Sequence, residues 1–229
     1  MHAEFDSYAG QYDALLADPL CDQFADRGFF YERKLALIRD FFRRHALDTK
    51  STAWVDIGCG QGDLLRLGVP DFASSMGCDV SPAMLHGCQG LTVLPQEQPD
   101  VLPFADKSAG FATAVCVYHH VPLEKRAALT REAARVLKPG GIFCIIEHNP
   151  LNPVTRRIVS RSPVDIDAHL LRAEETLRLL EDSGFRIVDR RYFLFLPEPL
   201  YRRGAVVEDW LARVPFGGQY AAFARAPNP

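Results

Sequence analysis

Three glycines at alternate positions are the feature of this sequence that points most directly to a bound ligand. They lie in VDIGCGQGDLL, residues 55–65, between an apolar run and an expected helix. A phosphate-binding P-loop would need Gly-Lys-Ser/Thr after the glycines, where Gln61, Gly62 and Asp63 stand instead. A dinucleotide loop would need the spacing GxGxxG, and Asp63 would repel a pyrophosphate from the positive end of the helix. We therefore expect an uncharged or cationic ligand here.

An acidic residue, Asp79, ends the second strand-like run, in GCDVS. In a doubly wound sheet, an acid at this position can accept hydrogen bonds from both hydroxyls of a ribose. The alternative is an acid that only stabilises the start of the helix expected at Ser81. Together with the glycine loop, the ribose interpretation indicates a nucleoside ligand without a diphosphate.

Histidines follow the next two expected strands. His119 and His120 lie in YHHV, and Glu147, His148 and Asn149 lie in IIEHNP. Ligands of open α/β sheets bind at the carboxyl ends of the strands, where a histidine can act as a general base. A role in shaping the site is the alternative. Our catalytic candidates are His148, which opens a long loop, and His120.

These residues need a scaffold of alternating strands and helices. From residue 51 onward, short β-rich runs alternate with helical patterns, which predicts βαβ units and a parallel sheet. Ser81 followed by Pro82 is typical of a helix start. Two strand-like runs, FRIVDRRYFLFL and GGQYAAFARA, end the chain with no helical pattern between them, so we expect a hairpin there. The predicted fold class is α/β, with a doubly wound sheet.

The domain organisation predicted is one structural domain with additions. Residues 1–50 carry apolar residues at helical spacing and are expected to form an N-terminal helical cap on the ligand-binding domain of residues 51–229. A lid-like insertion is expected at about 148–170, because this segment is too long for an ordinary connection. Arginines in and after it, which either clamp an acidic acceptor or form a solvated face, are Arg156, Arg157, Arg161 and Arg172.

Composition excludes several other classes of protein. The 229 residues carry a formal charge of −3, which gives no general attraction to nucleic acid. No apolar run approaches the ~20 residues of a membrane-spanning helix, and the first residues lack a signal-peptide pattern, so we expect a cytoplasmic protein without integral membrane association. The six cysteines show no zinc-ligand spacing, so no metal site is predicted and the thiols are expected to be reduced.

Four motifs, taken in order, resemble the class I S-adenosylmethionine-dependent methyltransferases, especially the small-molecule group that includes ubiquinone and menaquinone biosynthesis enzymes. The motifs are VDIGCGQG, GCDVSPAML, LPFADKSAGFATAVCVYHHV and REAARVLKPGGIFCIIE. The resemblance runs from about Phe5 to the end of the chain. It implies a Rossmann-like, mostly parallel sheet of seven strands with an antiparallel C-terminal hairpin. The sequence departs from the family pattern at SAGF, where SFD is usual, and at Gln98, where an aspartate usually receives the adenine amino group.

The same resemblance implies S-adenosylmethionine as the cofactor and assigns residues to it. The loop Gly58, Cys59 and Gly60 would present its backbone to the methionine half, and Asp56 would reach the amino group through water. Asp79 would bind the ribose. The other cofactor contacts that the resemblance implies come from the N-terminal FxxxAxxYD element, from the residues flanking the adenine and from the fourth-strand region: Tyr12, Val80, Met84, Gln98 and Val117.

A methyltransferase acting on a small molecule, a metabolite or a lipid-like compound, is the function that this resemblance implies. The acceptor would be anionic or lipid-linked if the arginines of the insertion contact it, and the chain would be a monomer or a homodimer. A regulatory protein that binds the cofactor without catalysis is one alternative, based on the departures at Gln98 and SAGF. A nicotinamide-dependent oxidoreductase is another, and it rests on the glycine spacing alone.

Overall fold

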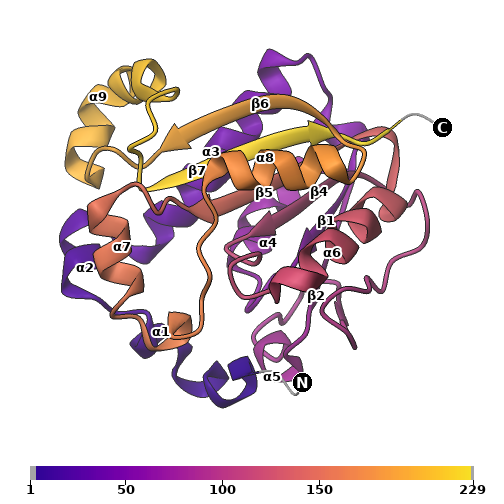
Figure 1. Ribbon diagram of the computed structural model, residues 1–229, viewed down its shortest axis with the longest axis horizontal. Coiled ribbons are helices and arrows are strands. Elements are labelled where there is room, and N and C mark those ends of the chain that lie inside the picture. Colours follow the sequence, from indigo (N-terminus) through magenta and orange to yellow (C-terminus); the bar gives the residue numbers. More distant parts are fainter. Residues whose placement is uncertain (1–3, 228–229) are drawn as a thin grey trace.

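A seven-stranded sheet with helices on both faces forms the centre of the molecule (Figure 1). The computed structural model describes residues 4–227. The strands stand in the order β3-β2-β1-β4-β5-β7-β6. In chain order they are β1 (Ala53–Ile57), β2 (Ser74–Asp79), β3 (Val93–Pro95), β4 (Ala109–Val115), β5 (Leu137–His148), β6 (Arg186–Phe193) and β7 (Gln219–Arg225).

Helices precede the first strand and separate most of the others. The α-helices are α1 (Tyr12–Leu15), α2 (Pro19–Phe24), α3 (Arg27–Arg44), α4 (Asp63–Gly68), α5 (Pro82–Leu85), α6 (Leu123–Val136), α7 (Pro153–Val159), α8 (Ala173–Asp182) and α9 (Glu198–Leu211). Short 3-10 helices are η1 (Glu4–Ser7), η2 (Ala9–Gln11), η3 (Thr49–Ser51), η4 (Val69–Asp71) and η5 (Pro163–Asp165).

Strand direction confirms the expected fold class. β1 pairs in parallel with β2 and β4, and β5 continues the parallel arrangement beside β4. β7 runs antiparallel to both of its neighbours, β5 and β6. The result is the Rossmann-like sheet, mostly parallel with an antiparallel C-terminal strand pair, in which the carboxyl ends of β1, β2, β4 and β5 share one edge.

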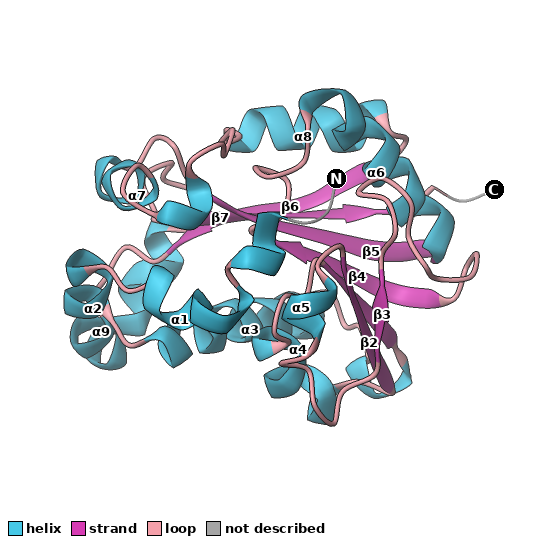
Figure 2. Ribbon diagram, turned by 90° about the horizontal axis from the view of Figure 1, so that it is seen from below, coloured by secondary structure: helices cyan, strands magenta, loops and turns pink. Residues whose placement is uncertain are grey.

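Helices cover both faces of the sheet (Figure 2), and an apolar core lies between the helices and the sheet on each face. On one face α6 and α8 contribute Leu129, Ala133 and Leu180, which are buried against the sheet. On the other face, α3 and α4 pack against the sheet, and the ring of Phe41 stacks on that of Phe223 in β7 at 4.0 Å between centroids. The helix α3 of the N-terminal segment is therefore part of a core.

The expected C-terminal hairpin is corrected in one respect: its two strands are not joined by a short connection. β6 and β7 do pair antiparallel, but α9 lies between them in the chain. Prolines stand at the start of this helix, and Gly204, whose backbone is non-helical, lies inside it. Both residue types are typical of helix ends and breaks, so they hide the helix in the sequence. The sequence pattern therefore gave no helical signal here.

The segment predicted as a lid-like insertion contains α7 and η5. It lies at the same end of the sheet as α2 (Figures 1 and 2). Asn152 caps α7 by accepting a hydrogen bond from the Thr155 amide at 2.9 Å. None of the helices formed by residues 4–227 combines the length and the apolar composition needed to cross a membrane.

Candidate active site

The glycine loop joins β1 to α4 with the backbone in an unusual conformation. Gly58 and Gly60 have φ angles of 67° and 54°, in the left-handed region that favours glycine. A Cβ atom placed on Gly58 would lie 2.5 Å from Cγ2 of Val117, which no real contact allows. The loop therefore brings its main chain close to the end of β4, and only backbone fits there.

Asp79 connects the second strand to this loop. Its Oδ2 accepts a hydrogen bond from the Gly60 amide at 2.8 Å, and its Oδ1 accepts one from the Ser81 amide at 2.8 Å. Burial raises the pKa of this carboxyl above its usual value, although the two amide contacts oppose the shift. Each oxygen keeps a lone pair for a further donor, so the carboxylate can receive two adjacent hydroxyls.

Asp56, near the end of β1, is a second buried carboxyl at the site. Its Oδ1 accepts a hydrogen bond from the Thr113 hydroxyl, and that hydroxyl accepts one from the indole N–H of Trp54 at 2.8 Å. Burial raises the pKa of Asp56 to about 7, and the nearby negative charge of Asp79 adds to the effect. The positive charge of Lys34 opposes it. Asp56 therefore changes charge near neutral pH.

A cavity of about 240 Å³ opens beside this loop, and we call it the glycine-loop cavity. Residues from the ends of β1, β2 and β4 line it together with the N-terminal segment. Nine of the residues assigned to the cofactor from the sequence are among its lining: Tyr12, Asp56, Gly58, Cys59, Gly60, Asp79, Val80, Met84 and Val117.

Gln98, the remaining assigned residue, is not among the residues lining this cavity. Its backbone carbonyl accepts a hydrogen bond from Nε2 of Gln96 at 2.9 Å. Gln96 and Glu97 line the cavity instead, two positions and one position earlier in the chain. The polar groups available to an adenine on this side are thus those of Gln96 and Glu97.

Lys34 is a lining residue that sequence reasoning missed. It lies on α3, its side chain is buried, and it makes no ion pair among the residues that the structure describes. Its Nζ lies 4.8 Å from the centre of the Tyr31 ring, which also lines the cavity. Lys34 lies four residues after Phe30 and four before Ile38, so it shares the apolar side of the helix with them. A lysine on the apolar side of a helix is a signal that could have identified this residue.

A second cavity, of about 420 Å³, adjoins the first and is called here the histidine cavity. Its walls include His119, His120 and His148, together with Asp165 from η5. Residues that line both cavities are Tyr12, Tyr31, Lys34, Cys116 and His120. A molecule in one cavity therefore lies next to a molecule in the other. The two histidines predicted as catalytic, His120 and His148, both face the second cavity.

Glu147, in β5, is hydrogen-bonded to the loop after β4. Its Oε1 accepts hydrogen bonds from the amides of Val117 and Tyr118, and its Oε2 lies 2.5 Å from Nδ1 of His119. Burial alone would raise the pKa of Glu147, but the charge and hydrogen bond of His119 hold it below its usual value. Burial would likewise lower the pKa of His119, and Glu147 and Asp165 raise it to about 10.

Asp165 meets both neighbouring histidines from the insertion. Its Oδ1 lies 3.3 Å from Nε2 of His119 and 3.4 Å from Nε2 of His120. Burial would raise the pKa of this carboxyl, but the two imidazoles hold it well below its usual range. Sequence reasoning missed Asp165, because a single aspartate in a loop far from the histidines carries no local signal.

His148 and His120 differ from His119 in their charge. Burial, followed by the positive charge of His119, lowers the pKa of His148 to about 4. Burial also lowers the pKa of His120, although Asp165 opposes the shift. Both rings are therefore neutral near pH 7, and each has one nitrogen free to accept a proton. The arginines of the insertion are placed otherwise: Arg156, Arg157, Arg161 and Arg172 are exposed and line neither cavity.

Comparison with known proteins finds a methyltransferase domain in part of the chain. Residues 55–145 match the methyltransferase domain family. The 2-methyl-6-phytyl-1,4-hydroquinone methyltransferase of Synechocystis is 28% identical over 157 residues, which cover 58% of this chain and 47% of that protein. The trans-aconitate 2-methyltransferase of Azoarcus is 31% identical over 140 residues, or 58% of this chain and 53% of that protein. The chain thus spans about half the length of these two curated relatives.

Solved structures show the same fold. A SAM-dependent methyltransferase from Archaeoglobus fulgidus superposes with a TM-score of 0.62 at 22% identity, over 87% of this chain and all of that one. One from Thermotoga maritima gives 0.68 at 19% identity, over 97% and 98% of the two chains. Residues 55–145 therefore match a methyltransferase domain, and the chain has the fold of these SAM-dependent methyltransferases. The glycine-loop cavity is lined by nine of the ten residues to which the sequence motifs assign S-adenosylmethionine.

Proposed function

We propose that the chain transfers a methyl group from S-adenosylmethionine to a small-molecule acceptor bound in the histidine cavity. The observation that carries the proposal is the contact between the two cavities, which share five lining residues. A cofactor in one and an acceptor in the other would meet at Tyr12, Cys116 and His120.

The residues of the glycine-loop cavity fit the cofactor well. The free lone pairs of the Asp79 carboxylate suit the two ribose hydroxyls. Asp56 is placed to balance the ammonium group of the methionine half, with the backbone of Gly58 and Gly60 beside it. Lys34, a buried cation at the same cavity, is the residue we assign to the methionine carboxylate.

When bound, S-adenosylmethionine supplies a methyl group on a sulfonium, whose sulfur is a good leaving group. The work left to the chain is to hold the acceptor in line with that methyl group. Proximity and orientation of this kind can contribute about 7–11 kcal/mol. The walls of the histidine cavity, which come from the N-terminal helices, the insertion and the end of β5, provide the orientation.

His148 is the residue that we assign to the proton of a hydroxyl acceptor. Its ring is neutral near pH 7, since burial lowers its pKa to about 4. Such a weak base takes a proton only as the acceptor oxygen shares its electron pair with the methyl carbon and becomes acidic. His120, which lines both cavities, is the second candidate. A positioned base typically contributes about 10² to 10⁴-fold in rate.

Apolar side chains form the part of the histidine cavity away from the histidines. They belong to α2, α3, α7 and the segment after β6: Phe24, Phe30, Ile158, Leu194 and Phe195. An acceptor with an apolar body and a hydroxyl at one end fits this division. The two curated relatives are named for different acceptors, a phytyl hydroquinone and trans-aconitate, and the apolar wall favours the first kind.

The N-terminal segment and the insertion both belong to this acceptor site in our proposal. Tyr12 and Tyr31 come from residues 1–50, and Thr155 and Asp165 come from residues 148–170. The cap and the lid predicted from the sequence would together enclose the acceptor and exclude water from the reacting groups.

Transfer of radiolabelled methyl from S-adenosylmethionine to a panel of phenolic, quinol and carboxylate acceptors tests the function. We expect turnover with an apolar hydroxyl compound, and a His148→Ala variant with kcat/KM at least tenfold lower. His86→Ala is the matched control, because His86 is exposed and lines neither cavity. An unchanged kcat/KM in His148→Ala would remove the role of His148, and no transfer to any acceptor class would count against the enzyme in favour of a cofactor-binding regulator.

A further inference from the structure

Two histidines and an aspartate converge on one point of the wall of the histidine cavity. His119, His120 and Asp165 each offer one ligand atom, these atoms lie within 4.8 Å of one another, and Oδ1 of Asp165 lies near Nε2 of both histidines. We propose that these three residues bind a divalent metal ion of the zinc type. Binding of the ion stands independently of the proposed function, whereas its use in catalysis rests on it.

The two distances from Asp165 to the histidines match the spacing of ligands on a small tetrahedral ion. Zn²⁺ holds imidazole nitrogen and carboxylate oxygen at about 2.0–2.2 Å, so two ligands on a tetrahedral ion lie about 3.3–3.5 Å apart. The Asp165 oxygen lies 3.3 Å from one imidazole nitrogen and 3.4 Å from the other. Both separations exceed the roughly 2.7–3.2 Å of a well-aligned N–H···O hydrogen bond.

Glu147 orients one of the ligands. It approaches Nδ1 of His119 at 2.5 Å, and a carboxylate accepts the N–H proton at that nitrogen. A metal ion that displaces the Nε2 proton would leave the ring neutral and be bound by the lone pair of Nε2 on the side of Asp165. Metal-binding histidines commonly donate their second N–H to a carboxylate in this way, which fixes the ring and strengthens the ligand.

The fourth coordination position would face the cavity. His119, His120 and Asp165 all line the histidine cavity, and His120 also reaches the glycine-loop cavity. Three protein ligands with one open position are typical of catalytic zinc rather than structural zinc. An acceptor hydroxyl bound at this position would be held beside the methyl donor, and the ion would lower the pKa of that hydroxyl. No oxidation or reduction is involved.

The metal would also join two distant parts of the chain. His119 and His120 lie in the loop after β4, whereas Asp165 lies in η5 of the insertion. Metal binding would therefore fasten the insertion to the end of the sheet. We expect added metal to raise the thermal unfolding temperature and to slow proteolytic cleavage within residues 148–170.

Cobalt binding to the full-length, chelator-treated protein tests the site directly, because Co²⁺ reports its coordination by visible absorption. We expect one Co²⁺ per chain with the intense bands of a four-coordinate ion, and displacement of those bands by Zn²⁺. Asp165→Asn and His120→Ala should each weaken binding at least tenfold. His86→Ala, which removes an exposed histidine, should bind as the wild type does.

Two results would overturn the metal site. One is the absence of stoichiometric Co²⁺ or Zn²⁺ binding by the wild-type protein, and the other is unchanged binding in both Asp165→Asn and His120→Ala. A proton on His119, shared with Glu147 and Asp165, would then be the occupant. Calorimetry with S-adenosylhomocysteine, the demethylated product of S-adenosylmethionine, distinguishes the loss of the metal site from a failure of the proposed function. Asp165→Asn should bind that product as the wild type does, which also shows that the variant is folded.

Discussion

Oδ2 of Asp79 accepts a hydrogen bond of 2.8 Å from the backbone amide of Gly60, and this bond joins the ends of β2 and β1 at the glycine-loop cavity. The same carboxylate is held on its other oxygen by the Ser81 amide. A side chain fixed in this way loses little freedom when a ligand binds. The arrangement therefore favours the two hydroxyls of a ribose over a loosely held counter-ion.

Asp79→Ala should weaken binding of S-adenosylhomocysteine by at least 100-fold, because a hydrogen bond to a charged group contributes about 1.5–3 kcal/mol and two such bonds are lost. Asp79→Asn keeps one acceptor and should lose less. Isothermal titration calorimetry measures both. Asp182→Asn, which changes an exposed aspartate on α8, is the control. Equal affinities for wild type and Asp79→Ala would remove the ribose contact.

Cofactor binding should depend on pH through Asp56. Its pKa of about 7 lies above the ordinary value because of burial, so lowering the pH from 8 to 6 protonates it in the folded protein. The neutral form no longer balances the ammonium group of the cofactor, and affinity should fall with pH. In Asp56→Asn the affinity should be lower at pH 8 and nearly constant over this interval. A parallel decline in both proteins would contradict the assignment.

The same group gives a second, independent pH effect on stability. A carboxyl whose pKa is raised in the folded state contributes stability below its unfolded pKa, and that stability is lost as pH rises through the folded pKa. Relative to Asp56→Asn, the free energy of unfolding of the wild type should therefore fall between about pH 3.8 and pH 7. Urea unfolding at several pH values measures the difference, and a difference that grows with pH would have the wrong sign.

Gly58→Ala should destabilise the protein and weaken cofactor binding together. The left-handed backbone at this position costs an alanine roughly 1–2 kcal/mol, and its Cβ would also contact Val117 at 2.5 Å. Adding Val117→Ala removes the clashing methyl groups, so the double variant should recover part of the stability. If the double variant is no more stable than Gly58→Ala, the clash with Val117 is not the cause.

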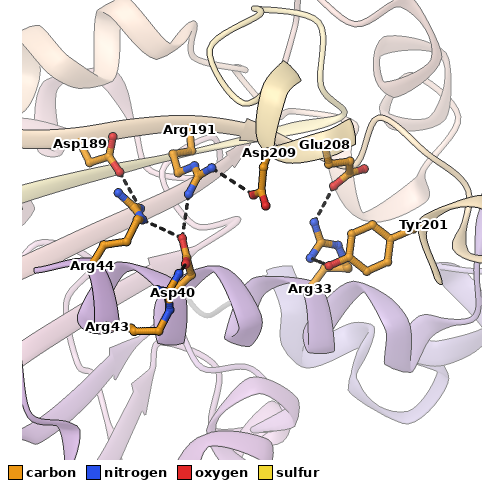
Figure 3. Close-up of polar contacts among 9 residues, drawn as sticks. All are labelled: Arg33, Asp40, Arg43, Arg44, Asp189, Arg191, Tyr201, Glu208 and Asp209. Atoms are coloured by element: carbon orange, nitrogen blue, oxygen red, sulfur yellow. Dashed lines mark hydrogen bonds and ion pairs between the residues drawn. The ribbon is translucent and has the colours of Figure 1, made fainter. Parts of the chain in front are cut away.

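A buried ion pair anchors α9 to α3 (Figure 3). Arg33 contacts Glu208 and the Tyr201 hydroxyl, each at 2.5 Å, and Oε1 of Glu208 accepts hydrogen bonds from the amides of Phe195 and Leu196. Breaking a buried pair on one side leaves the other charge uncompensated and typically costs about 3–5 kcal/mol.

Glu208→Ala should accordingly lower the free energy of unfolding by about 3–5 kcal/mol, as measured by urea unfolding. Glu198, on the same helix, pairs with Arg202 at the exposed surface, so Glu198→Ala should cost no more than about 1 kcal/mol. Similar losses for the two variants would show that the buried pair does not anchor α9.

Local sequence signals were enough to predict the residues of the candidate site that lie in the loops directly after β1 and β2. Alternate glycines and an acid at the end of the second strand predicted the positions of Gly58, Gly60 and Asp79, because parallel strands end at one edge of a sheet. The alternating pattern likewise predicted the α/β fold. These features depend on short-range geometry, which residue types and spacing record.

Contacts between distant segments could not be predicted in this way. Asp165 meets His119 and His120 only because η5 lies beside the loop after β4, and nothing near residue 165 in the sequence indicates this contact. α9 was missed because prolines and Gly204 obscure its periodicity. Lys34 was missed because the long helix that contains it carries many charged residues. Only its position on the apolar side of that helix distinguishes it from them.

Calorimetric titration of the wild-type chain with S-adenosylmethionine, with NADH as the comparison ligand, tests whether the glycine-loop cavity binds this cofactor. We expect one molecule of S-adenosylmethionine bound per chain, no heat with NADH, and loss of the signal in Asp79→Ala. A clear binding signal for NADH, with none for S-adenosylmethionine, would contradict this expectation.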